Sequence, residues 1–182
     1  MSSLKYRPEV DGLRAIAVLF VERMKQLIGN IIIYLFGMQH HVMGLYRLSR
    51  YFRLKVPIVG GQLSVIIRHA LRVYSSCDIS PLAVIEKDVS FMHPTGVVIG
   101  DGVIVRSGTK IWQQVTLGSH GKTGEEMCYP MIGNNVRIYA KSSIIGGVLI
   151  GENAIIGAHS LVLCDVPSGR TAAGVPAKVL EK

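Results

Sequence analysis

The chain has 182 residues, of which 49% are hydrophobic and 18% are charged, a composition that excludes intrinsic disorder and suits one repeat domain with a smaller second part. Its net charge of +8 lies entirely in residues 1–76, which carry eleven Lys/Arg against three Asp/Glu, whereas residues 77–182 carry nine of each. This asymmetry indicates either a solvated basic face or an anionic neighbour such as an acidic lipid or glycan; nucleic acid is not expected, because the basic part lacks a recognition motif.

Residues 5–20 read KYRPEVDGLRAIAVLF and resemble the start of the membrane acyltransferase-3 family, which modifies surface glycans. The charged residues at 22–25 interrupt the membrane helix that would follow in that family, so no activity is carried over. No small-residue cleavage site follows the apolar run, which argues against a signal peptide. The next apolar run, residues 27–38, is shorter than the roughly 20 residues that span a bilayer. Residues 5–20 are therefore interpreted as a fused or vestigial leader.

Two amphipathic helices are predicted at residues 42–56 and 62–74, because apolar residues recur there at helical spacing. Their inward stripes are predicted to be Leu45, Leu48, Phe52 and Val56 in the first helix, and Leu63, Ile66, Ile67, Ala70, Leu71 and Tyr74 in the second. The favoured interpretation is an N-terminal α-helical cap, since the open end of a repeat domain must be covered. The alternative is a basic amphipathic surface that lies peripherally on a membrane.

From residue 79 the chain follows a six-residue rhythm, with a two-residue slip and one break. Aliphatic or aromatic residues recur at Ile79, Ile85, Phe91, Val97, Ile99, Val105, Ile111, Leu117, Ile132, Ile138, Ile144, Ile150, Ile156 and Val162. Six is a multiple of the strand period of two and does not fit the helical 3.6, so these residues share one inner face. Such periods mark a parallel β-helix. We therefore predict an all-β repeat domain at 77–182, after a basic helical region at 1–76.

The break in the rhythm spans residues 118–131, which read GSHGKTGEEMCYPM. Insertions in a repeat domain map to loops, often on the binding face. We therefore expect this segment to protrude from the β-helix.

Four segments carry a resemblance to the hexapeptide-repeat acetyltransferases, most of all to the serine O-acetyltransferase-like branch. They are CDISPLAVI (77–85), HPTGVVIGD (93–101), VTLGSHGKTG (115–124) and TAAGVPAKV (171–179). The resemblance covers about residues 45–182 and implies a left-handed β-helix, an exception to the right-handed preference of crossover connections. It also implies a homotrimer that binds acetyl-CoA between subunits, without a metal.

In this resemblance His93 matches the general base, and Asp78 matches the carboxylate that orients it. His93 follows the inward Phe91 by two places, so it is expected at or near a corner. An acceptor hydroxyl needs a base that is largely neutral near pH 7 yet takes a proton, which suits His. Asp78 lies fifteen residues earlier, less than one coil of three hexads, so it can sit on the adjacent turn and hold one ring nitrogen. The alternative is an exposed corner His without a catalytic role.

The resemblance also assigns positions to the cofactor, namely Gly118, Ala140, Ala158, Cys164, Thr171 and Lys178. Small residues would allow the pantetheine arm to approach closely, Lys178 would meet the CoA phosphates, and N–H groups near Gly118 would stabilise the oxyanion. Simple corner packing explains Ala140 and Ala158 equally well.

The acceptor positions depart from the serine enzymes. Those enzymes have an Asp before the catalytic His and an Arg-His pair at the loop end, whereas here Met92 precedes His93 and residues 127–130 read MCYP. A desolvated free amino acid needs charged partners for both termini. We therefore predict a sugar hydroxyl as the acceptor. Its expected surroundings are Met92, Trp112, His120 and Tyr129, with Trp112 either a sugar platform or an aromatic that is exposed or packed in the trimer.

These features predict a cytoplasmic, acetyl-CoA-dependent O-acetyltransferase of a surface or capsular polysaccharide or its precursor. The cytoplasm also suits the scattered, odd set Cys77, Cys128 and Cys164. Serine O-acetyltransferase of cysteine biosynthesis is the alternative within the same class, and a non-catalytic trimeric β-helix that binds a partner is the alternative from another class. A metal enzyme of this fold is not expected, because the histidines lack converging spacing.

Overall fold

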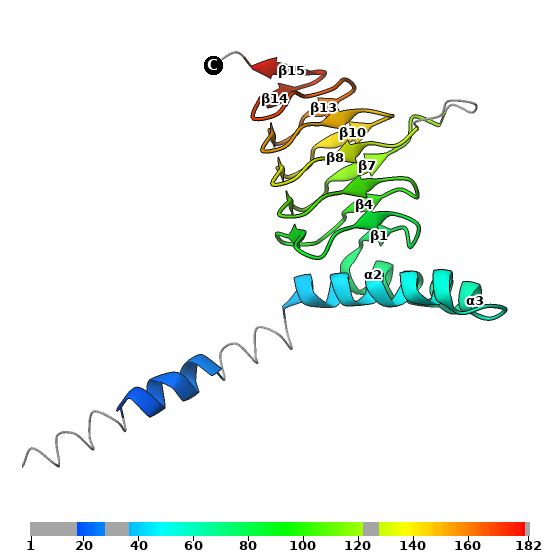
Figure 1. Cartoon of the computed structure of the whole chain (residues 1–182), viewed down its shortest axis with the longest axis vertical. Coiled ribbons are helices and arrows are strands. Elements are labelled where there is room, and N and C mark those ends of the chain that lie inside the picture. Colours follow the sequence, from blue (N-terminus) through cyan, green and yellow to red (C-terminus); the bar gives the residue numbers. More distant parts are fainter. Residues whose placement is uncertain (1–17, 28–36, 122–127, 181–182) are drawn as a thin grey trace, which may run out of the picture. The chain divides into compact units, whose positions relative to one another are not determined.

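A computed structural model describes residues 18–27, 37–121 and 128–180. The chain forms two compact units, Met1–Gly37 and Met38–Lys182. In the first unit, residues 18–27 form an exposed helix (blue in Figure 1). Most of the predicted leader, residues 5–20, lies outside the described residues. Among the residues that are described, no helix is both long enough and apolar enough to cross a membrane.

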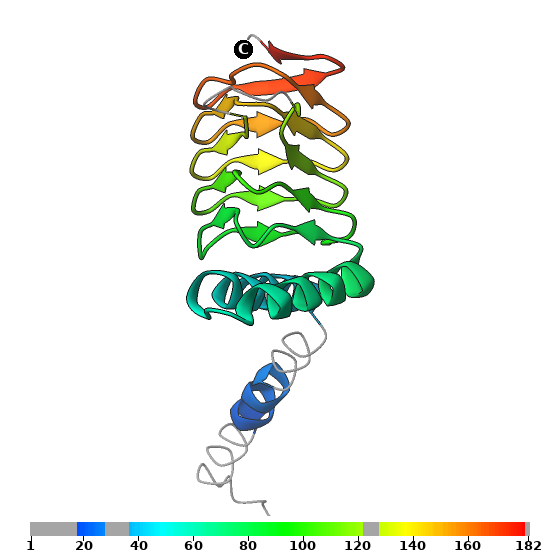
Figure 2. The same cartoon turned by 90° about the vertical axis from the view of Figure 1, so that its right-hand side faces the viewer.

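The second unit is a left-handed parallel β-helix preceded by two helices, as predicted (Figures 1 and 2). Each of the first four coils contributes one short strand to each of three sheets, whereas the last coil adds strands to the first and third sheets only, and the chain ends in a strand antiparallel to the one before it. The first sheet contains β1 (Asp78–Ile79), β4 (Val98–Ile99), β7 (Thr116–Gly118), β10 (Ser143–Ile145) and β13 (Leu161–Val162). The second contains β2 (Val84–Ile85), β5 (Ile104–Val105), β8 (Met131–Ile132) and β11 (Leu149–Ile150). The third contains β3 (Ser90–Phe91), β6 (Lys110–Ile111), β9 (Arg137–Ile138), β12 (Ile155–Ile156), β14 (Thr171–Gly174) and β15 (Ala177–Leu180).

The hexad residues form the core of this β-helix. Neighbouring coils pair in register, so that Ile79 lies beside Ile99 and Ile99 beside Leu117. Every repeat residue from Ile99 to Val162 is at most 2% exposed. Their alternation with outward residues follows from the pleat of short strands.

The two-residue slip lies at a different place from the one that the rhythm suggested. Val97 is buried, but it precedes β4 and belongs to a second inward column, in which its carbonyl accepts from the Asp78 N–H (2.8 Å). The repeat residue of this coil is Ile99, eight positions after Phe91. The two added residues widen the corner between β3 and β4. Val97 is as apolar and as buried as a repeat residue, which is why the rhythm alone could not separate the two columns at this point.

The helices α2 (Met38–Lys55) and α3 (Gly60–Ser75) pack against each other and cover the first coil (Figure 2). The buried Tyr46 hydroxyl donates to the Ala83 carbonyl (2.8 Å) and accepts from the Ile85 N–H (3.3 Å). It thereby replaces the strand that a preceding coil would supply. Arg47 and Arg50 donate to further main-chain carbonyls of that coil. Two of the excess cations thus satisfy main-chain carbonyls at the open end of the β-helix, and the alternative of a membrane-facing surface gains no support from them.

The predicted inward stripes of the two helices are largely wrong. Leu48 is 45% exposed, Ile66 is 63% exposed and Tyr74 is 46% exposed. The two helices instead meet through small residues: the Ser49 and Ser64 hydroxyls lie 3.0 Å apart. The buried residues are Val42, Met43, Tyr46 and Ser49 in α2, and Gly60, Ser64, Leu71 and Ser75 in α3.

The compact units divide between residues 37 and 38, and the domain boundary expected between residues 76 and 77 stays a prediction. Both helices therefore belong to the same compact unit as the β-helix. The predicted loop at 118–131 leaves the β-helix between β7 and β8, and its residues 122–127 lie outside the described part.

Candidate functional site

His93 lies on the widened corner between β3 and β4, with an exposed ring and a left-handed backbone conformation (φ +56°). The next residue, Pro94, accepts a hydrogen bond at its carbonyl from the Cys77 thiol (3.3 Å). Cys77 directly precedes Asp78, so this contact ties the His93 corner to the start of the first coil. The structure thus brings the predicted base and its predicted partner onto adjoining turns. Among the described residues, however, no hydrogen bond joins His93 to Asp78.

The Asp78 carboxylate is held instead by two arginines of α3. Arg68 Nε donates to one oxygen and Arg72 Nη2 to the other, each at 2.6 Å. The two arginines are four residues apart and therefore share one face of the helix. Burial by itself raises the pKa of the Asp78 carboxyl, but the hydrogen bonds and charges of Arg72 and Arg68 outweigh burial and hold this pKa below its ordinary value.

Sequence reasoning did not identify these two arginines as the partners of Asp78. The available signal was the i, i+4 spacing of Arg68 and Arg72 on a helix that ends just before Asp78. The orienting role of Asp78 toward His93 stays a prediction.

Met92 and Trp112 lie on neighbouring coils beside the His93 corner. The Met92 N–H donates to the Ile111 carbonyl (2.7 Å), which places Met92 next to Trp112. The Trp112 ring packs on the Tyr139 ring of the following coil, with centroids 4.6 Å apart and an interplanar angle of 34°. Trp112 is thus a partly buried aromatic that stacks on the following coil, and its role in the site stays a prediction.

His120 and Tyr129 lie on a different edge of the β-helix, at corners between the first and second sheets. A Cβ added at Gly100 would lie 2.7 Å from the Tyr129 ring, so this ring packs closely over the corner after β4. A Cβ added at Gly146 would lie 3.0 Å from the His120 ring. Within one subunit, the four predicted acceptor residues are thus divided between two edges.

The predicted cofactor residues are also divided, among three parts of the β-helix. Ala140 and Ala158 stack on neighbouring coils, since the His159 N–H donates to the Ala140 carbonyl (3.0 Å), and they lie on the edge that carries His93. Gly118 and the exposed Cys164 lie near the corners between the first and second sheets. Thr171 and Lys178 belong to β14 and β15, at the last part of the third sheet.

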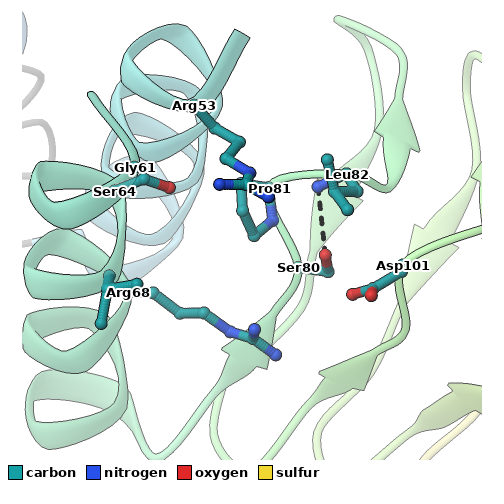
Figure 3. A pocket seen from close by; sticks show the side chains of 9 residues that line it. Arg53, Gly61, Ser64, Arg68, Ser80, Pro81, Leu82 and Asp101 are labelled. Atoms are coloured by element: carbon teal, nitrogen blue, oxygen red, sulfur yellow. Dashed lines mark hydrogen bonds between the residues drawn. The ribbon is translucent and has the colours of Figure 1, made fainter. Parts of the chain in front are cut away.

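A cavity of about 220 Å³ lies between the two helices and the first two coils (Figure 3). Arg53 and Arg68 extend into it from the helices, and Ser80 and Asp101 face them from the β-helix. Its lining includes none of the predicted site residues, but Arg68 connects it to Asp78. In the described part of the chain, no group of three or more His, Cys, Asp or Glu is arranged to hold a metal ion.

Comparisons with known proteins point to one class of enzyme. Residues 129–164 match the family model described as bacterial transferase hexapeptide (six repeats). Over 142 residues the chain is 37% identical to the serine acetyltransferase of Buchnera aphidicola subsp. Schizaphis graminum, covering 78% of this chain and 53% of that protein. It is 38% identical over 120 residues to the serine acetyltransferase of Escherichia coli K12, covering 66% of this chain and 44% of the relative.

Solved structures give the same result. The crystal structure of Neisseria gonorrhoeae serine acetyltransferase aligns with a TM-score of 0.76 and 33% identity, covering 82% of this chain and 58% of that one. A serine acetyltransferase in complex with CoA aligns with a TM-score of 0.71 and 33% identity, covering 79% and 57%. The chain spans about half the length of the curated relatives it matches.

The predicted saccharide acceptor is corrected by these comparisons, because the relatives are serine acetyltransferases. Serine was disfavoured because charged residues are missing at Met92 and at the loop end. The relatives named above also give no support to the acyltransferase-3 resemblance of residues 5–20. The β-helix of this chain is thus a hexapeptide-repeat domain of the kind found in serine acetyltransferases.

Proposed function

We propose that this protein is an O-acetyltransferase that transfers the acetyl group of acetyl-CoA to the hydroxyl of L-serine. The observation that carries the proposal is the 37% identity to a serine acetyltransferase over 142 residues, which extends across 78% of this chain. Acetyl-CoA as the donor is supported by the CoA complex of a structural relative. The cytoplasm, predicted from the cysteines, is part of the same proposal, and none of the three cysteines forms a disulfide.

In the proposed reaction, His93 removes the proton from the serine hydroxyl as its oxygen attacks the thioester carbonyl. The tetrahedral intermediate then collapses, the C–S bond breaks, and the CoA sulfur takes the proton from His93. The exposed ring of His93 is accessible to both substrates. Asp78 would stabilise the imidazolium formed in the first step, and N–H groups near Gly118 would stabilise the oxyanion.

The proposed active assembly is a homotrimer. The residues assigned to acceptor and cofactor lie on two different edges of one β-helix, and a site between subunits would join one edge of each neighbour. Outward apolar side chains are available for such a contact: Val84 and Leu149 on the second sheet are 40% and 42% exposed, and Val98 on the first is 39% exposed. Light scattering coupled to size-exclusion chromatography would give the mass of the assembly.

The direct test is release of free CoA from acetyl-CoA with L-serine, by wild type and by His93→Asn. Asn tolerates the positive φ of this corner, and loss of the base should lower kcat roughly 10²- to 10⁴-fold. His159→Asn, at a corner with φ +57°, is the matched control for folding, and both variants should keep the wild-type melting temperature. Wild-type protein that binds acetyl-CoA but shows no serine-dependent release would contradict the proposal.

A further inference from the structure

We propose that Arg72, with Arg68 beside it, binds the carboxylate of the acceptor and thereby selects a free amino acid. The inference rests on the proposed function and names the residues that would determine its acceptor specificity. It concerns α3, a helix to which the sequence assigned only a capping role.

The first support is the position of Arg72 relative to the His93 corner. The Arg72 carbonyl accepts from the Ser76 N–H (2.8 Å) at the end of α3, two residues before Asp78. The Gly96 N–H, on the same widened corner as His93, donates to the Ser75 carbonyl (3.3 Å). The last turn of α3 therefore lies directly against the corner that carries the proposed base.

The second support is an excess of positive charge. Among the described residues, Arg68 and Arg72 form ion pairs with Asp78 alone, so two cations share one carboxylate. A guanidinium has five N–H donors in a planar fork, and each arginine uses one of them on Asp78. The remaining donors suit a second carboxylate, for which Arg forms charge-assisted and often bidentate hydrogen bonds.

The third support is accessibility, which distinguishes the two arginines. The Arg72 side chain is 48% exposed, whereas that of Arg68 is 30% exposed. Arg68 extends between α3 and the first coil, toward the cavity that also contains Arg53 and Asp101 (Figure 3). Arg72 is therefore the residue that an incoming acceptor can reach, and Arg68 is the positioning residue that helps to hold Asp78.

The test compares L-serine with L-serinamide, which keeps the hydroxyl and lacks the carboxylate. Wild type should prefer L-serine, as measured by the ratio of the two kcat/KM values. Arg72→Gln should lower this ratio roughly 10- to 100-fold, mainly through a higher KM for L-serine, because a charge-assisted hydrogen bond is lost. The KM for acetyl-CoA should change less than threefold, and Arg72→Lys should restore part of the preference.

Arg53→Gln is the matched control. It removes the same charge from the same helix pair, and in the described part of the chain Arg53 forms no ion pair with Asp78. The ratio of kcat/KM for L-serine to kcat/KM for L-serinamide should be the same in Arg53→Gln as in wild type. The ratio does not depend on the amount of folded enzyme, so a general loss of stability cannot imitate the expected result.

Two outcomes would overturn the inference while leaving the proposed function intact. One is a wild type that acetylates L-serine without preferring it to L-serinamide. The other is an Arg72→Gln variant that loses activity toward both acceptors in the same proportion. A wild type that acetylates neither acceptor would overturn the proposed function itself.

Discussion

Removal of the Tyr46 hydroxyl tests how the helical cap stabilises the β-helix. This hydroxyl is buried and replaces a missing strand, because it donates to Ala83 and accepts from Ile85. In Tyr46→Phe the Ala83 carbonyl keeps a hydrogen bond from Arg50, but the Ile85 N–H loses its partner. The substitution therefore removes two hydrogen bonds and leaves one donor unpaired.

The expected cost follows from these two effects. A net hydrogen bond contributes about 1 kcal/mol, and an unpaired buried donor costs about 1–3 kcal/mol. Ile85 is half-buried, so water can reach part of this site and the lower end applies. We expect the free energy of unfolding to fall by about 2 kcal/mol and the melting temperature by roughly 4–8 °C for a chain of this size.

Urea unfolding followed by circular dichroism measures this difference. Tyr51→Phe is the control, because Tyr51 lies on the same helix with 57% of its surface exposed and should change stability by less than about 0.5 kcal/mol. If Tyr46→Phe were as stable as Tyr51→Phe, the hydroxyl would not replace a strand, and the proposed basis of capping would be refuted.

Three further predictions concern the first coil, the loop and the cofactor. The pKa of the Asp78 carboxyl is lowered in the folded state, so its ion pairs stabilise the fold above about pH 4. This stabilisation is lost as the pH falls through the folded pKa, so the difference in unfolding free energy between wild type and Asp78→Asn should shrink. Urea titrations at several pH values measure this difference. Gly102→Ala should lower the melting temperature, because the new Cβ would lie 2.9 Å from Cγ of the Tyr129 ring. Gly44→Ala is the control and should leave the melting temperature unchanged, because no atom lies within 4 Å of its new Cβ. Equal melting temperatures of the two variants would contradict the packing of the Tyr129 ring. In Gly118→Ala the new Cβ would contact only one side-chain atom, at 3.9 Å, so the melting temperature should be unchanged. The KM for acetyl-CoA should rise. An unchanged KM would show that Gly118 is not part of the cofactor site.

The β-helix could be predicted from the sequence because its core residues recur at a fixed interval. The period of six fixes which side chains point inward, and Ile132 through Val162 keep it without interruption. The phase at Val97 was misassigned, since this residue of the second inward column is apolar like a repeat residue and the corner at His93 shifts one column against the other. Local periodicity identifies a repeat, but it does not locate an insertion between two equivalent columns.

The helical cap was predicted as a covering element, but its contacts were not. Stripe analysis assumes that the largest apolar residues face the interior. Here Ser49 and Ser64 form the contact between the helices, and Ile66 remains exposed. Contacts made by small polar residues have no hydrophobic periodicity and therefore leave no such signal.

The candidate site was predicted only in part, for a related reason. The spacing of fifteen residues between Asp78 and His93 was enough to place them on adjoining turns, because one coil is slightly longer than this interval. The partners of Asp78 come from a helix before the repeat, where no periodicity relates them to it. Sequence spacing therefore did not indicate that Arg68 and Arg72 hold Asp78.

The widened corner breaks the translational symmetry of the β-helix at one point. In the described coils, the other corners between the third and first sheets keep the six-residue spacing, so their backbones are nearly interchangeable. A ligand that recognised only the regular corners could slide by one coil and bind in several registers. The two residues added at His93 make this corner different from the others, so a ligand that recognises its backbone can bind at only one position along the repeat.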